Sequence, residues 1–311
     1  MSIQPRSPDT PVDLIDMFRR DLKLRELSSI TCRIYPQRVA EFANFLHGDL
    51  RIVDRENLKS YLGYLRNDRS LKKKSIQCIF TSLSSFYDFL EDEKLVNSNP
   101  VRSMTKYLRS YKQTNESQDK QLISVEEASM LVNSVLDTRD KAVILLLLKT
   151  GIRCNELLSL DIQDLDLTEM TIRLKPTPKR SNRIVYIDQE TADVLSRWLK
   201  ARENRNKYGS SALFLTIRGT RPEISGVERM VEKRAEKVGL HDPRSKRTDS
   251  HFTPHCCRHW FTTHLIRAGM SRDFVKELRG DVRGDAIDIY IHIDKKELRE
   301  SYLAHIPQLG V

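Results

Sequence analysis

Apolar residues recur at helical spacing through the first third of the chain and predict four amphipathic helices. Asp54 is a suitable N-cap for the third helix, and Ser70 is the expected start of the fourth. The segment Asn97–Pro100 is a strong stop signal after the fourth helix. The expected helices cover residues 14–24, 29–46, 54–65 and 70–90. Together they predict a small all-helical domain.

The later part of the chain mixes two periodicities. Residues 141–149 are apolar nearly all round, which predicts a buried helix. Residues 171–175 and 183–188 alternate between apolar and polar, as expected of two strands flanking a turn. Further helices are expected at residues 189–206, 225–238, 254–268, 271–279 and 294–304. The predicted fold class is mainly α with a small antiparallel β-sheet.

Composition divides the chain into two parts. Residues 1–11 are rich in Pro, Ser and Thr and are expected to be disordered. Residues 111–121 contain almost no large apolar side chain, which is typical of a linker. We therefore expect one domain over residues 12–110 and a second over residues 122–311.

The net charge of the 311-residue chain is +10, from 53 Lys and Arg against 43 Asp and Glu. This balance favours a polyanionic partner such as nucleic acid, although charge alone does not exclude an ordinary basic protein. The five cysteines include no C-x-x-C pair, so we expect them to be reduced and intracellular. No apolar run is long enough to span a membrane, and no signal pattern opens the chain. We expect a cytoplasmic, nucleoid-associated protein with no membrane partner.

Five residues form a set suited to phosphodiester chemistry. Arg153 and Arg258 can clamp a phosphate, His255 and Lys179 can move protons, and Tyr290 can attack phosphorus. Taken alone, each has a plainer interpretation, such as an ion pair of Arg153 with Glu156 or a core position for Tyr290.

The segment Pro254–His259 has the pattern of a helix start, with Thr253 as N-cap and Pro254 in the first position. His255 and Arg258 then share one face. Cys256, Cys257 and His259 could suggest a metal site. Adjacent cysteines in one helix cannot both join two histidines around a tetrahedral ion, so we predict no metal. The sequence also lacks a P-loop, and we expect no cofactor.

The motifs Thr150-Gly-Ile-Arg-Cys-Asn-Glu-Leu157, His255-Cys-Cys-Arg-His259 and Tyr290-Ile-His292 resemble those of the tyrosine recombinase (phage integrase) family. The resemblance spans most of the chain. It implies a helical SAM-like core-binding domain followed by an α/β catalytic domain. It also implies a recombinase that cuts and rejoins double-stranded DNA through a 3′-phosphotyrosyl intermediate, as a homo-tetramer on DNA and without metal or ATP.

In the family, a lysine in the turn of the β-hairpin protonates the leaving 5′-oxygen. Counting back from the second strand favours Lys179, whereas counting forward from the first strand favours Lys175. Our prediction is Lys179, with Lys175 and Arg180 touching DNA phosphates. Lys72, Lys73 and Lys74 lie next to the expected start of the fourth helix and are a further candidate DNA contact, although a solvated charged face is the plainer alternative.

Asp281 follows Gly280 where the family commonly has histidine or tryptophan, and this version resembles that of archaeal relatives. A carboxylate there can hydrogen-bond to the tyrosine hydroxyl or to an arginine, or it can be held protonated. Two alternative functions remain open from the residues: a nicking-closing enzyme like a type IB topoisomerase, and a catalytically silent DNA clamp. The helix near the C-terminus could dock on its own domain or on a neighbouring protomer.

Overall fold

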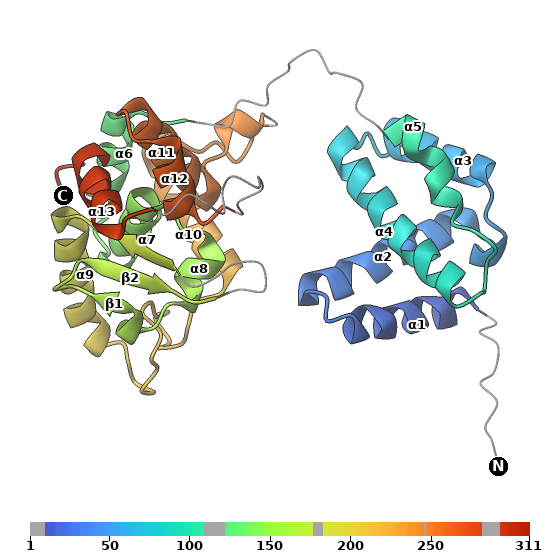
Figure 1. Cartoon of the computed structure of the whole chain (residues 1–311), viewed down its shortest axis with the longest axis horizontal. Helices are drawn as coiled ribbons and strands as arrows, with labels where there is room; N and C mark the ends of the chain where they lie inside the picture. Colours follow the sequence, from blue (N-terminus) through green and yellow to red (C-terminus); the bar gives the residue numbers. More distant parts are fainter. Residues whose placement is uncertain (1–9, 109–121, 177–182, 246, 282–292) are drawn as a thin grey trace. The chain divides into compact units, whose positions relative to one another are not determined.

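The computed structural model describes residues 10–108, 122–176, 183–245, 247–281 and 293–311. The chain divides into two compact units, Met1–Asn115 and Glu116–Val311 (Figure 1). Each unit has its own cluster of buried apolar side chains. That one unit binds DNA and the other carries the chemistry stays a prediction from the sequence.

The first unit is helical, as the spacing of its apolar residues predicts. Its α-helices are α1 (Pro11–Leu24), α2 (Ser29–Leu46), α3 (Arg55–Asn67), α4 (Lys73–Asp92) and α5 (Thr105–Leu108), with 3-10 helices η1 (Leu50–Ile52) and η2 (Pro100–Met104). Helix α1 begins with a capping box, in which the Thr10 hydroxyl accepts from the Asp13 N–H at 3.2 Å. In the core, the ring of Phe18 from α1 meets Phe86 of α4 edge to face, with centroids 5.3 Å apart.

The start of α4 differs from the sequence prediction. Ser70 has a left-handed backbone with φ of 47°, so it cannot begin the helix. Lys72 takes the N-cap position without a capping side chain, and the first helical residue is Lys73. Lys72 therefore precedes the helix, and Lys73 and Lys74 are its first two residues.

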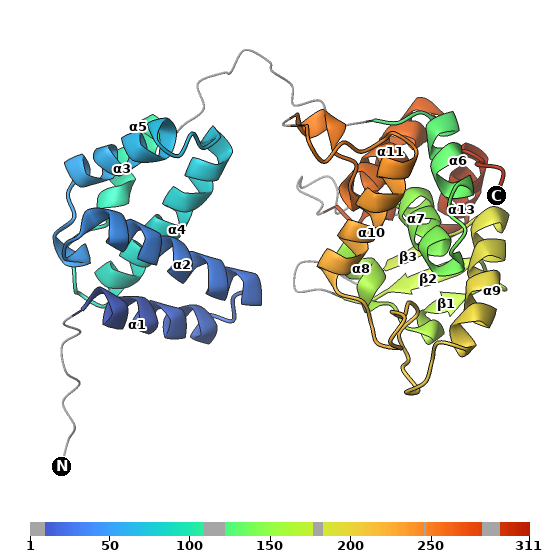
Figure 2. The ribbon, with the colours of Figure 1, turned by 180° about the vertical axis from the view of Figure 1, so that it is seen from behind.

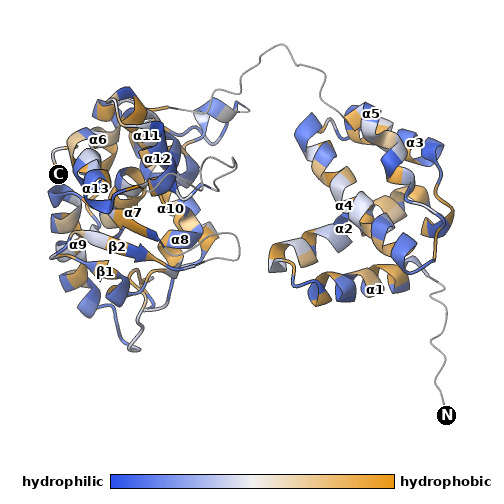
Figure 3. Cartoon of the chain, viewed as in Figure 1, coloured by the Kyte–Doolittle hydropathy of each residue, from blue (hydrophilic) through white to orange (hydrophobic). Residues whose placement is uncertain are grey.

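The second unit contains α6 (Val125–Asn133), α7 (Thr138–Thr150), α8 (Cys154–Ser159), α9 (Gln189–Glu203), α10 (Ile224–Lys237), α11 (Pro254–Arg267), α12 (Arg272–Arg279) and α13 (Lys295–His305), with the 3-10 helices Ile162–Asp164 and Thr248–Ser250. Helix α7 is the centre of this unit, because α9 and α11 both pack against it. Its residues 142–148 are all at most 2% exposed. The hydropathy colouring in Figure 3 shows α7 as a mostly apolar helix. The buried helix predicted over residues 141–149 is confirmed, and Asp137 extends it to Thr138 by capping its N-terminus.

In the described residues, three strands form one antiparallel sheet in the order β1 (Leu165–Asp166), β2 (Thr171–Leu174) and β3 (Arg183–Tyr186) (Figure 2). Ile172 pairs with Val185, and both side chains are buried. The predicted fold class, mainly α with a small antiparallel sheet, is confirmed. The short elements α8 and β1 were not anticipated, because six and two residues are too few to show a periodicity.

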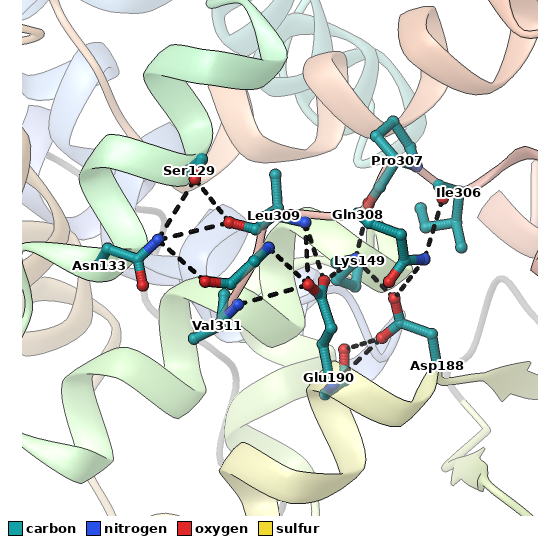
Figure 4. A network of polar contacts seen from close by, with 12 residues as sticks. Ser129, Asn133, Lys149, Asp188, Glu190, Ile306, Pro307, Gln308, Leu309 and Val311 are labelled. Carbon is teal, nitrogen blue, oxygen red and sulfur yellow. Dashed lines mark hydrogen bonds and ion pairs between the residues drawn. The ribbon is translucent and has the colours of Figure 1, made fainter.

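The C-terminal segment docks on its own unit in this chain, around the fully buried side chain of Lys149 (Figure 4). The ammonium group lies 2.5 Å from Asp188 and 2.7 Å from Glu190, and it donates to the carbonyl of Pro307 at 2.6 Å. Glu190 in turn accepts the backbone N–H groups of residues 309–311. A buried lysine is tolerated only with such partners, so the network fastens the end of the chain to α7.

Among the described residues, no helix combines the length and the apolar character that crossing a bilayer requires.

Candidate active site

The turn between α7 and α8 places Arg153. Gly151 ends α7 in the left-handed conformation, with φ of 60°, which is common for a glycine at a helix C-terminus. A Cβ atom at Gly151 would come within 2.3 Å of the Phe261 ring, so packing as well as backbone conformation requires glycine. Arg153 is extended and is the N-cap of α8, with a side chain that is 39% exposed.

Helix α11 places the second arginine. It begins at Pro254 with Thr253 as N-cap, which confirms the predicted helix start. His255 is exposed in the first turn, whereas Arg258, one turn later, is 3% exposed. Arg258 donates to the carbonyl oxygen of Gly151 at 2.6 Å and to that of Arg279 at 3.0 Å. Its guanidinium therefore ties the end of α7 to the end of α12.

Asp281 brings the two predicted arginines together. Its carboxylate lies 3.1 Å from Nη2 of Arg258, 3.7 Å from Nη2 of Arg153 and 3.2 Å from Nε of Arg279. The sequence left open whether Asp281 contacts the tyrosine hydroxyl or an arginine. In the described residues it contacts arginines. The carboxylate offsets part of the positive charge that collects here.

The environment of Arg258 shows how strongly positive this site is. Burial, together with the charges of Arg153 and Arg279, lowers the pKa of Arg258 to about 10, while Asp281 and Glu156 oppose the shift. The group is still protonated near neutral pH. Within the described part of the chain, the buried Nη1 of Arg153 has no hydrogen-bond partner. The two guanidiniums thus offer concentrated positive charge to an anionic ligand.

Glu156 supports the turn that carries Arg153. One of its oxygens accepts the backbone N–H of Arg153 at 2.7 Å, and both accept from the guanidinium of Arg183 at 2.8 and 3.0 Å. Burial alone would raise the pKa of Glu156, but these hydrogen bonds outweigh it and the pKa is lowered. The ion pair expected between the side chains of Arg153 and Glu156 is present but long, at 3.8 Å.

Lys175 is held at the base of the hairpin by carboxylates. Its ammonium forms an ion pair with Asp161 and lies 3.5 Å from Asp164, while Arg221 pairs with Asp161 at 2.5 Å. The hydrogen bond from Lys175 is the main reason that the pKa of Asp161 is lowered to about 2. Lys179 and Arg180, the other two basic residues of this turn, lie outside the described residues.

Of the two late tyrosines, Tyr290 lies outside the described residues, as does His292. Tyr302 is 1% exposed, and its hydroxyl donates to the carbonyl of Lys149 at 3.0 Å. Burial raises the pKa of Tyr302 well above its ordinary value, which makes it a poor nucleophile. The helix expected over residues 294–304, which contains Tyr302, is confirmed as α13.

Comparison with known proteins decides the family. A model of the phage integrase family matches residues 112–297, and a model of the phage integrase N-terminal SAM-like domain matches residues 14–96. The tyrosine recombinase XerC of Thermodesulfovibrio yellowstonii is 30% identical over 304 residues, which cover 93% of this chain and 94% of that protein. This chain belongs to the phage integrase family. As a member, it is a DNA strand-transferring enzyme that cuts and rejoins DNA through a phosphotyrosyl intermediate.

Two solved structures of other proteins have the same fold. The Tn1549 transposon integrase in complex with a circular intermediate DNA has a TM-score of 0.69 at 17% identity and covers 92% of this chain and 97% of its own. The XerH recombinase bound to its difH substrate has a TM-score of 0.66 at 20% identity, covering 94% and 83%. Both likenesses bear on the fold alone.

Several groups of this candidate site could not be found from the sequence. Arg183 and Arg279 join the network only because distant segments meet, and neither lies in a distinctive motif.

Among the described residues there is no cluster of three His, Cys, Asp or Glu side chains that could hold a metal. Cys257 is wholly buried, and burial raises the pKa of its thiol well above the ordinary value.

The candidate DNA contact in the first unit lies at the start of α4. Lys72 and Lys74 are exposed, and Lys73 is partly buried. Free N–H groups at a helix start and lysine side chains both favour phosphate. That these residues of the phage integrase contact DNA stays a prediction.

Proposed function

We propose that this chain is a site-specific recombinase in which Arg153 and Arg258 bind the scissile phosphate and Tyr290 attacks it. The observation that carries the proposal is the meeting of the two guanidiniums at Asp281, from two different segments of the fold. If a phosphate binds to both guanidiniums, they neutralise the negative charge that develops on its non-bridging oxygens during the reaction. His255, exposed on the same helix as Arg258, is the group for proton transfer beside the phosphate.

The reaction balances without any external reagent. The hydroxyl of Tyr290 gives its proton to His255 and its oxygen forms a bond to phosphorus, while the bond from phosphorus to the 5′-oxygen breaks. The leaving oxygen takes a proton from Lys179. The result is a 3′-phosphotyrosyl enzyme and a free 5′-hydroxyl. Because the ester energy stays in the protein–DNA bond, the proposal needs neither ATP nor a metal ion.

The contacts of Lys175 and Asp281 support separate tasks for them. Lys175 is engaged by Asp161 and Asp164, which favours Lys179 as the general acid and leaves Lys175 to fix the base of the hairpin. Asp281 holds the guanidiniums in place before a phosphate arrives. Arg180, which follows Lys179 in the sequence, contacts a phosphate of the DNA backbone in this proposal.

The partner is a duplex carrying the recombination site. Exchange between two duplexes breaks four strands, so four copies of the chain are required and a homo-tetramer on DNA follows. A protein acting in this way is expected at the nucleoid.

Covalent capture tests the proposed function. A library of nicked duplexes with randomised sequence is incubated with the full chain in EDTA and without ATP, and denaturation-resistant complexes are collected. The proposal predicts a recurring sequence bound through its 3′-phosphate. Relaxation of supercoiled DNA without strand exchange would favour a nicking-closing enzyme instead, and no adduct at all would favour a silent clamp.

A leaving group that needs no proton identifies the general acid. In a 5′-bridging phosphorothiolate the leaving atom is sulfur. We expect Lys179→Ala to cleave ordinary DNA at least ~100-fold more slowly than wild type, the scale of general acid catalysis. On the phosphorothiolate its rate should return to near the wild-type value. Cleavage rates measured on both duplexes give the comparison.

Lys175→Ala is the matched control, because it removes a lysine from the same hairpin. Its cleavage rate should fall by the same factor on both duplexes, and this factor should be smaller than that of Lys179→Ala on ordinary DNA. Rescue of Lys175→Ala and no rescue of Lys179→Ala would move the role to Lys175.

A further inference from the structure

Arg183 joins three parts of the second unit through one side chain. It is the first residue of β3 and directly follows the hairpin turn that holds Lys179. Its guanidinium donates to both oxygens of Glu156 at 2.8 and 3.0 Å, and its Nε donates to the carbonyl of Leu278 at 3.2 Å. Its side chain is 9% exposed. Because a guanidinium is planar and carries donors in fixed directions, one arginine can hydrogen-bond to Glu156 of α8 and to Leu278 of α12 at the same time.

Gly280 makes room for this guanidinium. A Cβ atom at Gly280 would lie 2.5 Å from Nη1 of Arg183 and 2.7 Å from its Cζ. Gly280 also has a φ of 60°, so both the space and the backbone favour glycine. The next residue, Asp281, carries the carboxylate that Arg153 and Arg258 share. The guanidinium of Arg183 therefore packs directly against the segment that sets Asp281.

Glu156 extends the same connection to the first arginine. Its second oxygen accepts both the Arg183 guanidinium and the backbone N–H of Arg153. A shift of Arg183 would thus displace Arg153 through the carboxylate of Glu156. It would also displace Asp281 through the neighbouring Gly280. Since Arg183 is also the first residue of β3, the same shift would move that strand relative to both Arg153 and Asp281.

We infer that Arg183 is a positioning residue, which sets the hairpin that carries the general acid against the arginine pair. The inference rests on the proposed function, because it takes a lysine of that turn as the proton donor. Arg183 itself touches no reacting atom. Its contribution is to fix, through Glu156, Leu278 and Gly280, where the turn stands when the phosphate is bound.

The test compares two leaving groups in the full chain, using the captured duplex with an ordinary 5′-oxygen and with a 5′-bridging sulfur. Arg183→Lys keeps the charge but loses the fork. We expect it to cleave the oxygen duplex about 10- to 100-fold more slowly than wild type, a part of what general acid catalysis supplies. The sulfur duplex should be slowed about tenfold less than the oxygen duplex, because its leaving group needs no proton. DNA affinity should stay near the wild-type value.

Two further variants keep the result interpretable. Gly280→Ala displaces the same guanidinium from its other side and should give the same difference between the two duplexes, even if Arg183→Lys folds poorly. Arg234→Lys is the matched control, because Arg234 forms a similar fork on the buried Asp140 away from the site. Arg234→Lys should lower thermal stability, but any slowing of cleavage should be the same on the oxygen duplex and the sulfur duplex.

Equal slowing of both duplexes in Arg183→Lys and Gly280→Ala would overturn the inference, since that pattern means general loss of structure. Wild-type rates in both variants would overturn it as well. Absence of adduct with the wild-type chain on either duplex is a different outcome, and it contradicts the proposed function instead.

Discussion

Tyr290→Phe should form no covalent adduct with a nicked DNA substrate while binding that DNA nearly as well as the wild-type chain. Phenylalanine removes only the nucleophilic oxygen and keeps the ring, so the chemistry is lost and the binding surface is not. Adduct yield on a denaturing gel and affinity from a mobility shift give the two readings. This is the largest effect that the account predicts, because no other group is assigned the attack.

The matched control is Tyr302→Phe, which removes the hydroxyl that donates to the carbonyl of Lys149. Loss of that buried hydrogen bond should lower the free energy of unfolding by about 1 kcal/mol and leave adduct formation intact. Adduct from Tyr290→Phe together with none from Tyr302→Phe would show that the nucleophile is misassigned.

Replacing either arginine of the pair should have the second largest effect. Arg153→Ala and Arg258→Ala are each expected to slow cleavage by at least ~100-fold, the loss seen when a group that stabilises transition-state charge is removed. Added EDTA should change the rate of neither variant nor of wild type. Single-turnover cleavage at saturating protein measures this step apart from DNA binding.

Arg258→Ala needs its own comparison, because Arg258 is buried and donates to the carbonyls of Gly151 and Arg279. Leaving these acceptors unpaired destabilises the fold, so Arg258→Lys tests the charge with less damage. Arg205→Ala breaks the ion pair with Asp137 and serves as the control. A chemical step that needs a divalent ion, or an Arg153→Ala variant of normal rate, would contradict the mechanism.

Local signals explain why much of the fold could be predicted. Helix starts were found where the sequence supplies a cap, as at Thr253 and Pro254, and the glycine after α7 has the backbone conformation that its position indicates. The start of α4 was misplaced at Ser70 because a serine before lysines looks like a cap although its backbone is left-handed. Capping and periodicity act over a few residues, so a single sequence contains them.

The site was only partly predictable, because its groups come from distant segments. Arg153, His255 and Arg258 could be proposed because they stand in motifs, and the structure brings the two arginines together at Asp281. The pairing of Arg183 with Glu156 spans 27 positions, and that of Arg258 with Asp281 spans 23. Nothing local marks such contacts. The ion pair of Lys175 with Asp161 likewise depends on how the hairpin packs, which spacing cannot tell.

The most direct measurement is to find which residue carries the DNA in the captured adduct. After nuclease treatment and digestion with trypsin, Tyr290 lies in the peptide 284–295, where it is the only tyrosine, and Tyr302 lies in the separate peptide 300–311. Mass spectrometry should place a nucleotide, joined through its 3′-phosphate, on Tyr290. A nucleotide on Tyr302, or on any residue of another peptide, would contradict the account.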